Sequence, residues 1–159
     1  MRLLVLGTGG MAKHHVEHFQ AIPGVEVVGG VDVSQERVDA FSDKHGIQNR
    51  FTSLEDAIAW GKFDSATNVT PDKAHHPTTM ALLAAGKNVM CEKPLAENHA
   101  KALEMTEAAE KAGVINMVNL TYRNVAPLQK ARAMVTAGEI GTVRHVEASY
   151  LQSWLVSKA

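Results

Sequence analysis

Short apolar runs and amphipathic stretches alternate along the start of the chain. Arg2–Leu6 is an apolar run of the kind found in buried strands. The segment Met11–Ile22 has helical periodicity, and Pro23-Gly24 ends it. A second apolar run, Val25–Val31, leads directly into Asp32. The pattern therefore predicts a strand, a helix and a second strand in the first 32 residues.

The same alternation continues through the rest of the chain. Predicted helices follow at Gln35–His45, Ser53–Trp60, Pro77–Ala85, Glu97–Ala112 and Val125–Ala137, with Pro77 in the first turn of its helix. Predicted strands follow at Arg50–Phe51, Ser65–Val69, Asn88–Cys91, Val114–Asn119 and Gly141–Trp154. Strands that alternate with helices indicate βαβ units. We therefore expect an α/β fold with a doubly wound, mostly parallel sheet of the Rossmann type.

A glycine-rich turn joins the first strand to the first helix. Gly7 permits a tight turn, Gly9 lets a pyrophosphate approach the backbone, and Ala12 is small where helix and strand pack closely. The helix then offers free N–H groups and a positive dipole end to the phosphates. Asp32, after the second strand, is placed to accept hydrogen bonds from a ribose. This context favours a dinucleotide site over an ordinary glycine-rich turn.

Five chemically suited residues fall at the carboxyl ends of predicted strands. They are Gly7, Asp32, Thr70, Glu92 and Asn119. Ligands of parallel α/β sheets bind outside the carboxyl ends of the strands, at the point where the strand order reverses. We therefore expect the ligand site at this edge of the sheet.

Composition narrows the class of protein. The chain has 159 residues, which suit one well-buried domain, and its 16 Lys and Arg nearly balance 17 Asp and Glu. That balance argues against nucleic acid or an anionic membrane as partner. Cys91 is the single cysteine, so no internal disulfide forms and a cytoplasmic location is expected. The sequence shows neither a signal peptide nor a membrane span.

Six motifs occur along the chain in a fixed order. They are Gly7-x-Gly9-x-x-Ala12, Thr70-Pro71-x-x-x-His75, Ala85-Gly86-Lys87-Asn88-Val89, Glu92-Lys93-Pro94-Leu95, Asn119-x-x-Tyr122-Arg123 and Gly138-Glu139-Ile140-Gly141. This combination resembles the Gfo/Idh/MocA (glucose–fructose oxidoreductase, inositol dehydrogenase, rhizopine catabolism) family. Family members are NAD- or NADP-dependent oxidoreductases of sugars, polyols and related compounds. The resemblance implies a Rossmann domain at 1–120, then a connecting helix and the start of a C-terminal substrate and dimerisation domain at 121–159.

The resemblance also implies roles for individual residues. Lys93 is the expected catalytic residue, which holds or polarises the reacting hydroxyl. Glu92 is expected beside the nicotinamide ribose, and Arg123 is expected to shape the pocket. The complete set of expected cofactor contacts is Gly7, Thr8, Gly9, Gly10, Met11, Ala12, Asp32, Ser34, Thr70, Pro71, His75, Glu92, Lys93 and Arg123. His75 is equally compatible with a helix-start cap, and the Lys93–Pro94 peptide is a candidate cis bond.

One part of the family pattern is missing. The family's catalytic Asp-x-x-x-His lies far downstream of Glu92-Lys93-Pro94, and this chain ends at Ala159. We therefore expect a truncated form that binds the dinucleotide but turns over no substrate alone. In this interpretation Gly141–Trp154 is the first strand of the missing domain.

The sequence leaves the choice between NAD and NADP open. Asp32 favours NAD, because its charge repels a 2′-phosphate, whereas Ser34 and a folded-back Arg37 would admit NADP. Helical geometry favours an exposed Arg37. His14 and His18 have a spacing that can hold a metal, but a solvated helix face is favoured and no metal is expected.

The expected reaction transfers hydride between nicotinamide and a hydroxyl-bearing carbon of a small sugar-like substrate. The first alternative is a non-catalytic dinucleotide-binding module. The second is an oligomerising module, because alternating apolar residues at 146–155 would leave an uncovered strand. We expect the full-length protein to be a homo-oligomer, whether it is an oxidoreductase or a non-catalytic module.

Overall fold

A parallel α/β sheet forms the main body of the protein in the computed structural model, which describes residues 1–152. The strands are β1 (Arg2–Leu6), β2 (Glu26–Val31), β3 (Asn49–Phe51), β4 (Ser65–Asn68), β5 (Asn88–Glu92) and β6 (Asn116–Asn119). The helices are α1 (Gly10–Gln20), α2 (Gln35–His45), α3 (Leu54–Trp60), α4 (Asp72–Ala84), α5 (His99–Ala112), the 3₁₀ helix η1 (Thr121–Asn124) and α6 (Ala126–Thr136).

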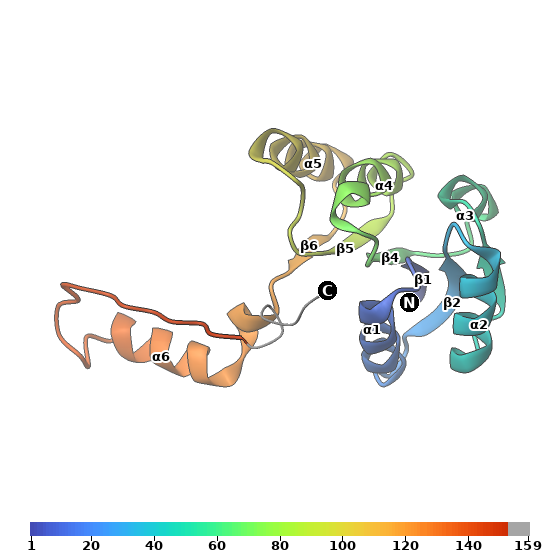
Figure 1. Cartoon of the computed structure of the whole chain (residues 1–159). Coiled ribbons are helices and arrows are strands. Elements are labelled where there is room, and N and C mark those ends of the chain that lie inside the picture. Colours follow the sequence, from blue (N-terminus) through green and yellow to red (C-terminus); the bar gives the residue numbers. More distant parts are fainter. Residues whose placement is uncertain (153–159) are drawn as a thin grey trace. The chain divides into compact units, whose positions relative to one another are not determined.

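All strand pairings are parallel, in the order β3-β2-β1-β4-β5-β6. Helices α1 and α2 lie on one face of the sheet, and α3, α4 and α5 lie on the other (Figure 1). Alternate residues of β1 enter two separate cores: Leu3 and Val5 pack with Ala12 of α1, whereas Leu4 and Leu6 pack with the opposite layer. The predicted doubly wound sheet is confirmed, and its order reverses between β1 and β4.

The chain divides into two compact units, Met1–Leu120 and Thr121–Ala159. The first unit contains the whole sheet. The described part of the second unit holds η1 and α6, and there the rings of Tyr122 and Tyr150 meet edge to face with centroids 5.4 Å apart. The role predicted for residues 121–159, a linker into a further domain, stays a prediction.

The predicted strand Gly141–Trp154 is wrong over its described part. Residues 141–152 form no strand, and Val146, Tyr150 and Leu151 are largely exposed. A strand needs a neighbouring strand to satisfy its N–H and C=O groups. None of the six described strands pairs with this segment, so its alternating pattern alone does not make it a strand. Trp154 lies outside the described residues.

The fourth helix begins earlier than predicted. Pro71 is its N-cap and Asp72 its first residue, so Pro77 lies inside α4 rather than in its first turn. Pro77 has no N–H, so it cannot donate the usual helical hydrogen bond to the carbonyl of Lys73, four residues earlier. Lys73 is exposed, so water can satisfy that carbonyl and the helix continues through the proline.

Predicted helix ends are confirmed where side chains or glycines provide them. The Ser53 hydroxyl accepts a hydrogen bond from the Asp56 amide at the start of α3. Gly46, Gly61 and Gly113 end α2, α3 and α5 in left-handed conformations. Because the helices begin and end at these residues, the segments that connect them to the strands are short. The positions of the strand ends, where the candidate site lies, are therefore well defined.

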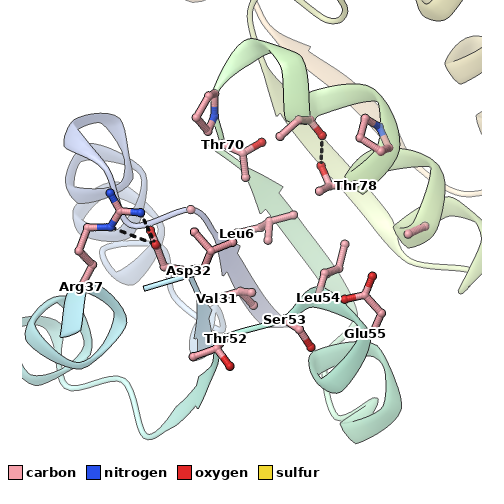
Figure 2. A pocket seen from close by; sticks show the side chains of 16 residues that line it. Leu6, Val31, Asp32, Arg37, Thr52, Ser53, Leu54, Glu55, Thr70 and Thr78 are labelled. Atoms are coloured by element: carbon pink, nitrogen blue, oxygen red, sulfur yellow. Dashed lines mark hydrogen bonds and ion pairs between the residues drawn. The ribbon is translucent and has the colours of Figure 1, made fainter. Parts of the chain in front are cut away.

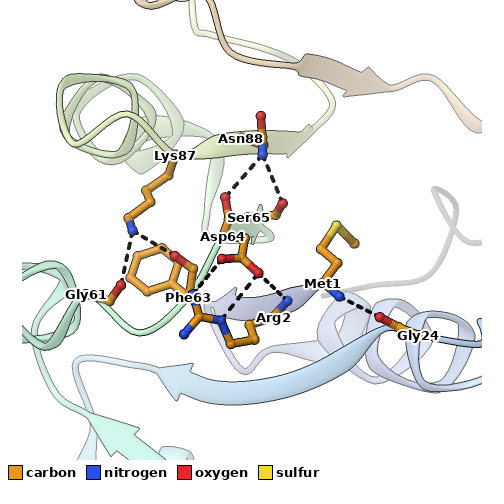
Figure 3. A network of polar contacts seen from close by, with 9 residues as sticks. All are labelled: Met1, Arg2, Gly24, Gly61, Phe63, Asp64, Ser65, Lys87 and Asn88. Carbon is orange, nitrogen blue, oxygen red and sulfur yellow. Dashed lines mark hydrogen bonds and ion pairs between the residues drawn. The ribbon is translucent and has the colours of Figure 1, made fainter.

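Polar contacts close the edge of the sheet where the strands begin (Figure 3). The Arg2 guanidinium lies 2.7 Å from an Asp64 carboxylate oxygen, and the Arg2 amide donates to the same carboxylate at 2.8 Å. These bonds lower the pKa of Asp64 to about 2. Lys87 Nζ donates to the carbonyls of Phe63 and Gly61 at 2.7 and 3.2 Å. The residues of the candidate site lie at the opposite, carboxyl ends of the strands.

Candidate dinucleotide site

The glycine turn after β1 is built for close approach. Gly7 has φ +92°, and a Cβ there would lie 2.8 Å from the Val69 carbonyl oxygen. Around Gly9 and Gly10, in contrast, an added Cβ would meet nothing within 4 Å. Gly7 thus seats the turn against β4, while the next two glycines leave room above the backbone.

The first turn of α1 presents unused donors to that space. Gly9 is the N-cap and has no side-chain hydrogen bond. Within residues 1–152, no hydrogen bond uses the amides of Gly9, Gly10 or Met11. Free amides at the positive end of a helix dipole bind anions. Ala12 is fully buried against the sheet, which confirms its predicted packing role and brings the helix start close to β1.

Asp32 lies beside this turn at the end of β2 and is 9% exposed. One carboxylate oxygen accepts from the Thr8 hydroxyl at 2.7 Å and the Thr8 amide at 3.1 Å. The other accepts from the Ser34 amide at 3.0 Å and from Arg37. Burial acts to raise the pKa of Asp32, but these hydrogen bonds outweigh it and the pKa lies below its ordinary value. The carboxylate is therefore ionised and held in place.

Arg37 is exposed, as helical geometry predicted, and its guanidinium also turns back to Asp32. Its guanidinium nitrogens lie 2.7 and 3.1 Å from Asp32 Oδ1, although 61% of the side chain is exposed. Figure 2 shows this pair at the rim of a pocket of about 390 Å³ that Leu6, Val31, Leu54, Thr70, Pro71 and Thr78 also line. The size and the mixture of apolar walls with a few polar groups suit a small ligand.

The turn after β4 is held by two buried side chains. Asn68 Oδ1 accepts from the Thr70 hydroxyl at 2.7 Å. Both ring nitrogens of His75 face main-chain oxygens, with Nδ1 2.7 Å from Pro94 O and Nε2 2.8 Å from Thr70 O. His75 is 1% exposed and joins the Thr70 turn to the Pro94 turn. Its contact with a cofactor stays a prediction.

Glu92 ends β5 inside a buried polar cluster. Its Oε1 accepts from the Asn119 amide at 2.6 Å and lies 2.9 Å from His15 Nε2. Its Oε2 accepts from the Lys93 amide at 3.2 Å. Burial acts to raise the pKa of Glu92, but the bonds from Asn119, His15 and Lys93 outweigh it, so the pKa is lowered. Sequence reasoning missed His15, although its place between Ala12 and Phe19 on the buried stripe of α1 could have revealed it.

Lys93 follows Glu92 and is exposed. Its side chain makes no hydrogen bond or ion pair with any described residue. The Lys93–Pro94 peptide is cis, as the sequence suggested. A free ammonium group next to a buried carboxylate can approach a ligand at this edge. Arg123 belongs to the second unit, so its predicted contact with the cofactor stays a prediction.

Comparisons with known proteins identify the family of this fold. The family model for the oxidoreductase family with an NAD-binding Rossmann fold matches residues 1–120. The chain belongs to the Gfo/Idh/MocA oxidoreductase family. Its Rossmann unit therefore carries the NAD-binding fold of that family, with the glycine turn after β1 at the switch point and Asp32 after the neighbouring strand β2.

Several proteins similar to this chain are named for sugar or inositol substrates. The chain is 33% identical to a 1,5-anhydro-D-fructose reductase from Ensifer adhaerens over 97% of its length, and 28% identical to the scyllo-inositol 2-dehydrogenase (NADP(+)) IolU from Bacillus subtilis over 96%. It spans 48% and 46% of those two proteins. The WlbA dehydrogenase from Bordetella pertussis, solved with NADH and UDP-GlcNAcA, is 29% identical with a TM-score of 0.83 over 88% of this chain and 43% of that one.

Among residues 1–152, no group of three or more His, Cys, Asp or Glu side chains is arranged to hold a metal ion. His14 and His18 are both exposed, and His18 Nδ1 lies 2.6 Å from the His14 carbonyl oxygen. In the same residues, no helix has the length and apolar character needed to cross a bilayer.

Proposed function

We propose that this chain is the dinucleotide-binding part of an NAD(P)-dependent oxidoreductase for a hydroxyl-bearing carbon of a sugar, polyol or related compound. The observation that carries the proposal is the open space above Gly9 and Gly10, lined by unused amides and flanked by the ionised Asp32. A diphosphate and the adjoining adenosine ribose have complementary chemistry. The residues present therefore fit the cofactor that the family implies.

Each group has a defined task in this proposal. The amides of Gly9 to Met11 bind the diphosphate, and Asp32 accepts hydrogen bonds from the adenosine ribose. Bound nicotinamide supplies the hydride donor or acceptor. The Lys93 ammonium donates a hydrogen bond to the substrate oxygen and stabilises the negative charge that develops there. Glu92 faces the nicotinamide ribose from the neighbouring position.

NAD is the preferred cofactor in this proposal, with NADP as the alternative. The Asp32 carboxylate suits a ribose diol and repels a 2′-phosphate. Arg37, already in contact with Asp32, partly offsets that charge and is close enough to bind the phosphate if it leaves the carboxylate. Both dinucleotides therefore have a physical basis for binding, and their relative affinity depends on this ion pair.

Calorimetric titration of the purified chain with NAD⁺ and NADP⁺ tests the proposal. We expect saturable binding of one dinucleotide per chain, tighter for NAD⁺, and no turnover of sugars or polyols by the chain alone. A folded sample that gives no saturable heat with either dinucleotide contradicts it. In a longer form that carries the family's C-terminal domain, Lys93→Met should lose turnover and keep dinucleotide affinity. Unchanged turnover in Lys93→Met would refute the catalytic role of Lys93, and a longer form without any turnover would favour the non-catalytic alternative.

We also propose a cellular location and an oligomeric state for this protein. The buried, unpaired thiol of Cys91 suits a reducing compartment such as the cytoplasm. Homo-oligomerisation is supported by the outer strand β6. Met117 of this strand is 51% exposed, and Ile115, which directly precedes the strand, is 77% exposed. Exposed apolar groups on an edge strand favour association. Light scattering of dilute protein tests this, and a clean monomer contradicts it.

A further inference from the structure

A buried histidine, His15, has no task in the proposed function so far. It lies on α1, one and a half turns beyond the glycine loop, and its side chain is 4% exposed. Its two ring nitrogens reach different strands: Nδ1 lies 2.7 Å from the Thr67 hydroxyl of β4, and Nε2 lies 2.9 Å from Glu92 Oε1 at the end of β5. One side chain therefore connects the helix of the phosphate loop to the strand that leads to Lys93.

For a neutral His15 ring, the donors and acceptors in this chain of contacts have one consistent order. An ionised carboxylate only accepts hydrogen bonds, so the proton of a neutral His15 ring lies on Nε2 and is donated to Glu92. Nδ1 is then an acceptor, and the Thr67 hydroxyl donates to it. Every polar atom of the ring is satisfied in this arrangement. A neutral His15 is thus a directed link from Thr67 to Glu92.

With this link, the two oxygens of Glu92 accept different numbers of hydrogen bonds. Oε1 receives both His15 and the Asn119 amide, at 2.9 and 2.6 Å. Among residues 1–152, Oε2 receives only the Lys93 main-chain amide, at 3.2 Å. Groups from α1, β6 and the turn after β5 therefore fix the rotation of the carboxylate. The oxygen with spare acceptor capacity is the one that faces the Lys93 turn. Carboxylates held in this way recognise hydroxyl groups with little loss of entropy.

We infer that His15 is a positioning residue, which aims Glu92 Oε2 at a hydroxyl of the nicotinamide riboside and couples the phosphate-binding helix to the Lys93 turn. The inference rests on the proposed function, because it needs a dinucleotide at the edge of the sheet. A merely structural histidine would stabilise the fold and would affect all ligands of the site alike. A positioning histidine affects ligands that reach Glu92 and spares ligands that stop at the diphosphate.

The test compares NADH with ADP, which contains the adenosine and diphosphate but lacks the nicotinamide riboside. We would titrate both ligands into the chain and into His15→Leu, His15→Asn and His15→Gln. The leucine has no polar group, the shorter asparagine amide stays on the Thr67 side, and the longer glutamine amide can donate to Glu92. His14→Gln is the matched control, because His14 is the exposed neighbour on the same helix.

We expect NADH affinity to fall on the order of tenfold in His15→Leu and His15→Asn, the usual effect of losing one charge-assisted hydrogen bond. ADP affinity should stay within about twofold, His15→Gln should recover most of the NADH affinity, and the control should match the parent chain. Unchanged NADH affinity in His15→Asn, or an equal loss for NADH and ADP, overturns the inference. Should His15→Leu fail to unfold cooperatively, the asparagine and glutamine variants decide alone. A parent chain that binds ADP but not NADH contradicts the proposed function instead.

Discussion

Replacing Gly7 with alanine should disrupt the turn on which the site depends. Two effects add at this position. The φ angle is +92°, outside the regions that alanine prefers, and the new Cβ would lie 2.8 Å from the Val69 carbonyl oxygen and 3.0 Å from the Thr70 amide nitrogen. All of these neighbours are main-chain atoms, so relief requires β1 and β4 to move apart rather than a side chain to rotate.

The magnitude follows from these two terms. An unfavourable backbone conformation costs about 1–2 kcal/mol, and forced overpacking costs about 1–3 kcal/mol. We therefore expect Gly7→Ala to lower the free energy of unfolding by about 2–5 kcal/mol, a large part of the roughly 5–15 kcal/mol of a typical domain. The variant should also bind ADP more weakly, because the amides of Gly9 and Gly10 move with the turn.

Gly46→Ala measures the cost of the backbone conformation without the cost of overpacking. Gly46 ends α2 with φ +69°, and a Cβ there would meet nothing within 4 Å. This variant should lose about 1 kcal/mol from backbone conformation alone. Urea unfolding of the parent and both variants supplies the free energies. If Gly7→Ala loses no more stability than Gly46→Ala, the close approach of Gly7 to β4 carries no energetic weight and the reasoning fails.

Three further predictions use other contacts. Arg37→Ala should weaken NADP⁺ binding about tenfold and leave NAD⁺ within about twofold; calorimetry measures both, and equal changes would contradict the role of Arg37. Because the pKa of Asp64 is lowered to about 2, its ion pair with Arg2 stabilises the fold above the unfolded pKa near 4 and is lost as pH falls toward 2. Urea midpoints should therefore fall less steeply over that range in Asp64→Asn than in the parent, and identical slopes would refute this. Asn98→Ala should cost about 1 kcal/mol, since its side chain caps α5 through the Lys101 amide; an unchanged urea midpoint would show the cap to be dispensable.

Local signals predicted most of the Rossmann unit. Apolar runs, helical periodicity and glycine stops depend on residues three or four positions apart, so they are legible in the sequence. They placed Gly7, Asp32 and Glu92 at strand ends, where the structure has them. The same reasoning failed for residues 141–152, because an alternating pattern is necessary for a strand but a pairing partner is also needed.

Contacts between distant residues were decided by the tertiary structure. His15 and Glu92 lie 77 positions apart, and they meet because the sheet order places β1 beside β4 and β4 beside β5. Arg37 turned back to Asp32 because a fixed, buried carboxylate outweighs solvation of one exposed guanidinium. The sequence alone thus determined which elements form and which chemical groups follow them. Only the packing of the sheet decided which of those groups touch, since a hydrogen-bond partner depends on position in space rather than on spacing along the chain.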